Sequence, residues 1–377
     1  MSRSLAEASA DLDGAEPLAG LRAEASEELD GAEPLAGLRA GDTLRQPALA
    51  ATLAAIADDG ADALYAGAVG RRLVAGLRAR GAALTEDDLA SFAPETTEPL
   101  TAGFRGLTLH TSPPNSSGVL LLQALAAFER AGGDTGSLAH LLRQGAAQRE
   151  RELADPRHAP FDRAAWLGDD RLGELARDRA PAVTGTHPTG DTVAVVAADG
   201  EGRAVSLIQS LCGSFGSHEL EPQTGILMQN RGAFFSLVPG HPNELAPGKR
   251  PSHTLMPLIA ERDGAFAGAL GTMGGKAHAQ IHAQVLLALL GGATAQDAVA
   301  APRWVTGGLD PGKSDLAARA ERSLDPATRA ALTGAGFSVT EVPWPDEDLG
   351  HAQVIWASDG VLDAGSDPRA DGAALTG

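Results

Sequence analysis

Apolar residues recur with two different spacings along the chain. Over some stretches they return every three or four positions, as in helices that pack one face on a core; over others they alternate or form short runs, as in strands. Thr85 and Asp88 add the layout of a capping box at the start of one helical stretch. The predicted helices span residues 46–58, 61–80, 85–92, 119–128, 277–290 and 294–301. The predicted strands are a pair within 97–111, several from 192 to 238, and 254–261, 264–271, 337–342, 351–357 and 361–364.

The first 40 residues differ from the rest. Residues 6–23 recur almost unchanged as residues 23–40, and two copies are too few for a repeat solenoid, which needs about three or more. The segment is acidic and holds few large apolar side chains, so it cannot bury enough surface to fold alone. We therefore predict that residues 1–40 form a mobile arm.

Composition excludes several classes of protein. The net charge of −19 over 377 residues argues against nucleic acid or an anionic membrane as a partner. No run of about 18 apolar residues predicts a membrane span. The single cysteine, Cys212, excludes an intramolecular disulfide framework. The first residues lack the apolar region of a secretory signal, which predicts a cytoplasmic location.

The strongest chemical signal lies in a predicted strand pair near the middle of the chain. Asp191-Thr192 leads into an apolar run, an Asp199-Gly200 turn and a second strand through Ser210. A threonine that opens a strand is, by itself, an ordinary β-branched strand former. Later motifs give it a second interpretation; they are Gln229-Asn230-Arg231-Gly232, Lys249-Arg250-Pro251 and Met273-Gly274-Gly275. In this order and at this spacing the chain resembles the catalytic subunit of the γ-glutamyltranspeptidase-like family, whose members are N-terminal-nucleophile hydrolases.

The resemblance implies an α/β fold of the αββα type, in which two stacked sheets are flanked by helices. It also implies that the chain cuts itself between Asp191 and Thr192. The small catalytic subunit would then be residues 192–377, and residues 41–191 would be the C-terminal part of the large subunit with its linker. We expect the two fragments to stay together as a heterodimer that acts on a small-molecule amide without a metal or other cofactor.

The chemistry of an N-terminal threonine fits this interpretation. A threonine hydroxyl needs a base, and a free α-amine, which titrates near pH 8, can take its proton. Thr192 is therefore the candidate nucleophile. The resemblance implies that Ser210 supplies a second hydroxyl bonded to it, and that the N–H groups of Gly274 and Gly275 form the oxyanion hole. Taken alone, the two glycines favour a plain turn between a strand and a helix; Thr192, Ser210 and Lys249-Arg250-Pro251 in the expected order favour the oxyanion hole.

The expected substrate-binding positions depart from those of the glutathione enzymes. An Asn and an Asp that hold the substrate ammonium in the family are here Cys212 and Phe234, and losing the carboxylate removes a bond worth about 1.5–3 kcal/mol. Arg231 is either a carboxylate anchor or part of a structural ion pair. The family's Ser-Ser pair becomes His253-Thr254. We therefore expect poor glutathione hydrolysis and a pattern closer to the family's acylases and amidohydrolases.

Other features leave alternatives open. The family has about 150 further residues before the equivalent of Gly41, a length comparable to a domain, so the sandwich is expected to be incomplete in its N-terminal half. His278 and His282 share a helix face but lack a third metal ligand, which favours surface or packing roles. Two functions remain: an amidohydrolase or acyltransferase, acting on γ-glutamyl, cephalosporin-type or oxamate-type amides, or an inactive relative that serves as an assembly or binding subunit.

Overall fold

The structure, a computed structural model, describes residues 43–177, 191–307, 316–358 and 360–376. The predicted acidic arm lies outside these residues. The chain divides into two compact units: residues up to Thr96 with Gly213–Asn230, and Thr97–Cys212 with Arg231–Gly377. Every candidate site residue belongs to the second unit.

The first unit is small and helical. Its helices are α3 (Pro47–Asp59), α4 (Asp62–Tyr65), α5 (Ala68–Ala79) and α6 (Glu86–Ala90), and its two short strands are β5 (Leu220–Glu221) and β6 (Ile226–Leu227). The capping box predicted at Thr85 is confirmed, because the Thr85 side chain accepts from the Asp88 N–H while the Asp88 carboxylate accepts from the Thr85 N–H. Thr224, which is distant in sequence, contacts α3, because the Thr52 hydroxyl donates to the Thr224 carbonyl at 2.8 Å.

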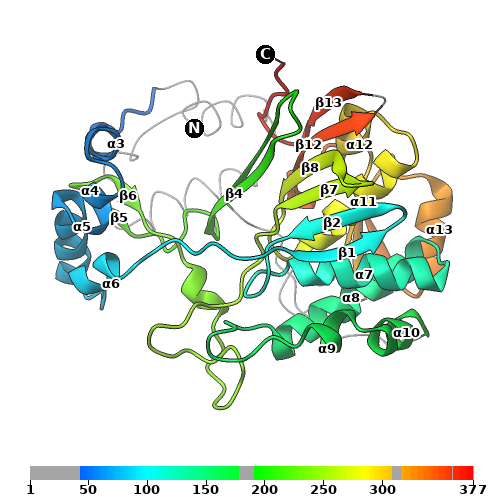
Figure 1. Cartoon of the computed structure of the whole chain (residues 1–377), viewed down its shortest axis with the longest axis horizontal. Coiled ribbons are helices and arrows are strands. Elements are labelled where there is room, and N and C mark those ends of the chain that lie inside the picture. Colours follow the sequence, from blue (N-terminus) through cyan, green and yellow to red (C-terminus); the bar gives the residue numbers. More distant parts are fainter. Residues whose placement is uncertain (1–42, 178–190, 308–315, 359, 377) are drawn as a thin grey trace. The chain divides into compact units, whose positions relative to one another are not determined.

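A six-stranded antiparallel sheet forms the centre of the second unit (Figure 1). Its strands run in the order β1-β2-β7-β8-β12-β13. Their bounds are β1 (Leu100–Phe104), β2 (Leu107–Thr111), β7 (Leu258–Arg262), β8 (Ala265–Met273), β12 (His351–Ser358) and β13 (Val361–Ser366). The strand pair predicted within 97–111 is confirmed, and its turn at Arg105 and Gly106 uses positive φ angles of 47° and 77°.

Helices cover one face of this sheet. The apolar faces of α7 (Gly118–Ala131), α11 (His278–Leu290) and α12 (Ala295–Ala300) pack on the strands, with α8 (Thr135–Glu152), α9 (Arg163–Leu167), α10 (Asp169–Arg177) and α13 (Pro326–Gly334) beyond them. The buried core is almost entirely aliphatic, from Leu109 on β2 to Ile281 on α11, both 0% exposed. Burial of this apolar surface is the main force that holds the layers together. Among the described helices, none combines the length and apolar character that crossing a membrane requires.

A two-stranded sheet, β3 (Asp191–Ala198) and β4 (Ala204–Cys212), packs on the opposite face of the large sheet against β8 and β12. Side chains of this pair alternate: the inward ones face β8, while the outward Val193, Val195, Val205 and Leu207 are 49–56% exposed. The two sheets stack face to face with helices on the free face of the larger one, which confirms the predicted α/β fold. Within the described part of this unit, no helical layer covers the outward face of β3–β4.

Two stretches correct the sequence prediction. Residues 213–238 were expected to be mainly strands, but they hold only β5, β6 and the 3₁₀ helix η1 (Arg231–Phe234). Tight turns break this region, since Gly216 and Gly225 have φ angles of 57° and 68°. A three-stranded sheet of β9 (Trp304–Thr306), β10 (Ala317–Glu321) and β11 (Ser338–Val342) was only partly expected, because β9 has three residues and β10 carries no large apolar side chain.

Candidate active site

Thr192 stands at the start of β3, where the pairing with β4 shifts register next to Asp191. The strand can lie close to the large sheet because Gly271 of β8 leaves room for the methyl group of Ala194; a side chain at Gly271 would begin 3.0 Å from that methyl. The Ser206 hydroxyl donates to the carbonyl of Leu270 at 2.8 Å and fixes β4 in the same way. Small residues and one side-chain hydrogen bond therefore set the position of the threonine.

Ser210 lies directly opposite Thr192 on β4. Thr192 Oγ1 and Ser210 Oγ are 2.8 Å apart and hydrogen-bonded, and the Cys212 N–H donates to the same serine oxygen at 2.9 Å. Cys212 follows with a φ of 83°, a value that marks the end of the strand. The predicted pairing of the two hydroxyls is thus present, and Cys212 takes part through its backbone.

Gly274 and Gly275 form the tight connection between β8 and α11. Their φ angles are 152° and 50°, and a short 3₁₀ turn, η2 (Gly275–Ala277), leads directly into α11 at His278. A Cβ on Gly274 would come within 2.3 Å of the Ile281 side chain. Only glycine fits here, and the first backbone N–H groups of a helix start are unpaired donors suited to a developing oxyanion.

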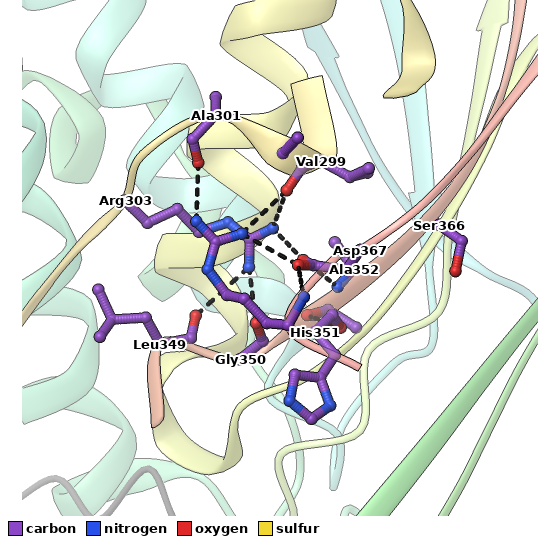
Figure 2. A network of polar contacts seen from close by, with 12 residues as sticks. Val299, Ala301, Arg303, Leu349, Gly350, His351, Ala352, Ser366 and Asp367 are labelled. Atoms are coloured by element: carbon purple, nitrogen blue, oxygen red, sulfur yellow. Dashed lines mark hydrogen bonds and ion pairs between the residues drawn. The ribbon is translucent and has the colours of Figure 1, made fainter. Parts of the chain in front are cut away.

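A buried network of charges holds the neighbouring backbone in place (Figure 2). The Arg303 guanidinium donates to the carbonyls of Gly350 at 2.8 Å and Val299 at 2.6 Å and pairs with Asp367. Asp367 in turn pairs with Arg369 at 3.0 Å, and Arg369 pairs with Glu321 at 2.5 Å. All four side chains are at most 1% exposed, so two cations and two anions balance one another without water.

This network bears on the glycine pair through Gly350. A Cβ on Gly350 would begin 2.4 Å from the Met273 carbonyl oxygen and 3.4 Å from the Gly274 Cα. The next residue, His351, pairs with Met273, and its carbonyl accepts from the Thr272 hydroxyl at 2.7 Å. Gly350, whose carbonyl accepts a hydrogen bond from Arg303, is therefore packed closely against Met273 and Gly274 at the end of β8.

Arg231 and Phe234, both on η1, form a cationic patch with Lys276. The Arg231 guanidinium lies 5.3 Å from the centre of the Phe234 ring, and the Lys276 ammonium lies 5.7 Å from the same centre. Lys276 also pairs with Glu150 at 3.0 Å. Burial lowers the pKa of Arg231 from its usual value, although the guanidinium stays protonated. The Phe234 ring therefore makes cation–π contacts with two cations.

His253 and Thr254 lie on an extended segment that runs beside residues 115–117. The Ser117 hydroxyl and N–H both donate to the His253 carbonyl, at 2.6 and 2.9 Å. Burial and the nearby Arg231 and Arg250 lower the pKa of His253 to about 4, so the imidazole is neutral. Its Nδ1 is buried without a partner among the described residues.

Three residues near the site were missed as functional candidates or assigned differently: Lys276, His278 and His351. His351 and Thr192 line the same cleft, of about 440 Å³, together with Met273. Burial lowers the pKa of His351 to about 4. The sequence offered one signal for two of these residues, because Lys276 and His278 lie one and three residues after Gly275. No sequence pattern pointed to His351. The described residues contain no group of three or more His, Cys, Asp or Glu side chains arranged to hold a metal ion.

Comparison with known proteins identifies relatives over almost the whole chain. The family model described as gamma-glutamyltranspeptidase matches residues 34–377. The chain is 36% identical to the oxamate amidohydrolase proenzyme of Klebsiella pneumoniae and 34% identical to the glutathione hydrolase-like YwrD proenzyme of Bacillus subtilis. Each match covers 89% of this chain and 66% of the relative, so the chain spans a little less than two thirds of these relatives' length.

A solved structure gives the same result for the fold. The cephalosporin acylase from Bacillus halodurans superposes with a TM-score of 0.82 at 28% identity, covering 100% of this chain and 70% of the acylase chain. The α/β fold implied by the sequence motifs is therefore confirmed by an independent comparison of coordinates.

Proposed function

The chain belongs to the gamma-glutamyltranspeptidase family, and we propose that it is a self-cleaving amidohydrolase whose nucleophile is Thr192. Its substrates are short amides whose acyl group carries a carboxylate. The single observation that carries this proposal is the 2.8 Å hydrogen bond between Thr192 Oγ1 and Ser210 Oγ at the start of β3. The Thr192 hydroxyl donates to Ser210 in this bond, which fixes the orientation of the oxygen that attacks once a base has taken its proton.

Self-cleavage generates the catalytic group. The Thr192 hydroxyl oxygen attacks the carbonyl carbon of Asp191, the peptide C–N bond breaks, and the Thr192 nitrogen takes the proton that the hydroxyl loses. Water then hydrolyses the resulting ester, leaving a carboxylate on Asp191 and a free amine and hydroxyl on Thr192. The products are residues 1–191 and 192–377, which remain together as two subunits. The word proenzyme in the names of both relatives supports such a step.

Turnover uses the new amine as a base. The amine takes the Thr192 hydroxyl proton while the oxygen attacks the substrate carbonyl, and the N–H groups of Gly274 and Gly275 stabilise the oxyanion. The tetrahedral intermediate then collapses and expels the amine product, which takes the proton from the Thr192 ammonium. An acyl ester remains on Thr192. Water attacks this ester by the same route, and the acid product leaves with the threonine restored.

The cationic patch supports the choice of acyl group. Arg231 can bind a carboxylate through two parallel hydrogen bonds, and Lys276, which is paired with Glu150, lies against the same Phe234 ring. A substrate ammonium would face these cations with no carboxylate at position 234 to pair with it. The site therefore favours acyl groups with a carboxylate and no ammonium, as in oxamate, over γ-glutamyl groups.

Two chromogenic substrates that differ in one group test this proposal. Glutaryl and γ-glutamyl p-nitroanilide share the chain and the leaving group, and only the second carries an ammonium. We expect kcat/KM to be at least about tenfold higher for the glutaryl compound, since an unpaired charge costs one to two powers of ten. Arg231→Leu should lose most of this activity, whereas Arg322→Leu, which removes an exposed arginine paired with Glu341, should not. Preference for the γ-glutamyl compound, or no turnover of either compound or of oxamate, would contradict the proposal.

A further inference from the structure

Two buried histidines on one face of α11 each bind a carbonyl of the same extended segment. His278 Nδ1 donates to the Thr254 carbonyl at 2.8 Å, and His282 Nε2 donates to the Met256 carbonyl at 3.1 Å. The two side chains are one helical turn apart, and the two carbonyls are two residues apart on an extended segment. The two spacings are similar, so both histidines can reach a carbonyl. The residues considered above for surface or packing roles are thus hydrogen-bonded to backbone.

Both imidazoles are neutral. His278 and His282 are 0% and 1% exposed, and burial lowers their pKa values to about 3 and about 4. The charged or titratable groups near His278 are His282, Arg231 and His253, all of which disfavour a further positive charge. A neutral imidazole carries one N–H, so the bond to Thr254 fixes the Nδ1–H tautomer of His278.

Packing alone does not account for these residues. Ile281, Val285 and Leu286, also buried on α11, are aliphatic, and the buried amide of Gln280 is paired with Thr306. An imidazole costs more to bury than a leucine unless its N–H finds a partner. Residues 254–257 form no ladder with a neighbouring strand, so their buried carbonyls need donors from elsewhere. The histidines supply them.

His278 differs from His282 in what else it touches. Its ring carbon Cδ2 lies 3.6 Å from the point where a Cβ would stand on Gly274. The imidazole therefore lies on the side of Gly274 from which a side chain would project, and it donates to the carbonyl of Thr254. His282 donates instead to Met256, which is not among the candidate site residues.

We propose that His278 is a positioning residue that sets the spacing between the oxyanion glycines and the substrate-binding segment at Thr254. The inference rests on the proposed function, because it assigns a purpose to a distance that matters only if both groups act on one substrate. Displacement of a catalytic donor by about 1 Å can cost about 100-fold in rate.

Three variants separate positioning from stability. His278→Leu keeps the bulk and removes the N–H; His278→Asn places an amide N–H where Nδ1 stood; His282→Leu removes the equivalent bond one turn away. We expect His278→Leu to lower kcat by about 10–100-fold, with a smaller change in KM, and His278→Asn to recover most of it. His282→Leu should lower the thermal midpoint as much as His278→Leu, yet keep kcat within about threefold of the parent, because its bond goes to Met256, which is not among the candidate site residues.

The outcomes distinguish two kinds of failure. If the parent protein neither cuts itself nor turns over the anilides, the proposed function falls, and this inference with it. If the parent is active and kcat of His278→Leu stays within twofold of it, or if both leucine variants lose kcat in proportion to stability, the positioning role is wrong while the function stands. Imidazole ¹⁵N NMR of the full chain adds a readout besides activity: an Nε2–H tautomer at His278 would overturn the inference directly.

Discussion

The strand pair β3–β4, which carries Thr192 and Ser210, and the turn after β8, which carries Gly274 and Gly275, are held by different forces. The turn is backed by fully buried ion pairs through Gly350 and by the core helix α11. The strand pair rests on one face only, and its outward valines are about half exposed. The glycine turn is therefore coupled to the stability of the whole unit, whereas the position of Thr192 depends on packing of one sheet face and a few local hydrogen bonds.

Breaking the buried ion-pair network should cause the largest loss in the free energy of unfolding. Asp367→Ala leaves Arg303 and Arg369 without their shared carboxylate in a dry environment, and an uncompensated buried charge costs about 3–5 kcal/mol. Urea unfolding measures the loss. Glu341→Ala, which breaks exposed pairs with Arg322 and Arg329, is the control and should cost less than about 1 kcal/mol. Equal losses would show that the network contributes no more than surface pairs.

A methyl group at Gly350 tests the contact with the glycine turn. Gly350→Ala places a carbon 2.4 Å from the Met273 oxygen, so the turn must shift, and we expect a loss of about 2–4 kcal/mol and a fall in kcat. Gly336 also has a positive φ, 91°, but nothing lies within 4 Å of its Cβ position. Gly336→Ala should therefore cost only backbone strain, about 1–2 kcal/mol, with kcat unchanged. If Gly350→Ala leaves kcat unchanged, the contact between Gly350 and the glycine turn has no effect on catalysis.

Acid should weaken the oxyanion side through the buried histidines of α11. The pKa values of His278 and His282 are lowered in the folded protein, so the unfolded chain binds more protons between about pH 4 and 6.5, and stability falls as the pH falls through this range. We expect a loss of about 1–2 kcal/mol per histidine between pH 7.5 and 5. Denaturant titrations at several pH values measure it, and the pH dependence should be shallower in His282→Leu. An unchanged dependence in that variant would contradict the assignment.

The smallest effect on stability is expected on the nucleophile side. Ser210→Ala removes the hydroxyl next to Thr192 and should cost about 1 kcal/mol of stability but about 10–100-fold in kcat. Ser206→Ala removes an equivalent bond from the same face of β4, to the Leu270 carbonyl, and should cost similar stability with little change in kcat. If the two serine variants behave alike in both measurements, Ser210 is a structural residue only.

Much of this arrangement could be predicted from the sequence, and the reasons are local. The capping box at Thr85, the turn at Arg105-Gly106 and the strand pair around Asp199 depend on neighbouring residues, so pattern and spacing suffice. The pairing of Thr192 with Ser210 follows from the same strand pair and was predicted from the motif order. These contacts span few residues and need no knowledge of the tertiary fold.

The remainder depends on contacts between distant parts of the chain. Arg303 is buried because it pairs with Asp367, 64 residues further along the chain, whereas charge alone predicts exposure. His278 and His351 acquire their surroundings from segments remote in sequence. The short strands β9 and β10 form only through partners. The hydrophobic pattern of one segment does not predict contacts with segments distant in sequence.

Intact mass spectrometry with N-terminal sequencing tests the central claim most directly. The purified chain, incubated near neutral pH, should convert to two pieces ending at Asp191 and beginning at Thr192, while Thr192→Ala stays intact and Thr192→Ser, which keeps a hydroxyl, is still cut. The account is contradicted if the parent chain remains whole after prolonged incubation, or if Thr192→Ala is cut at the same bond.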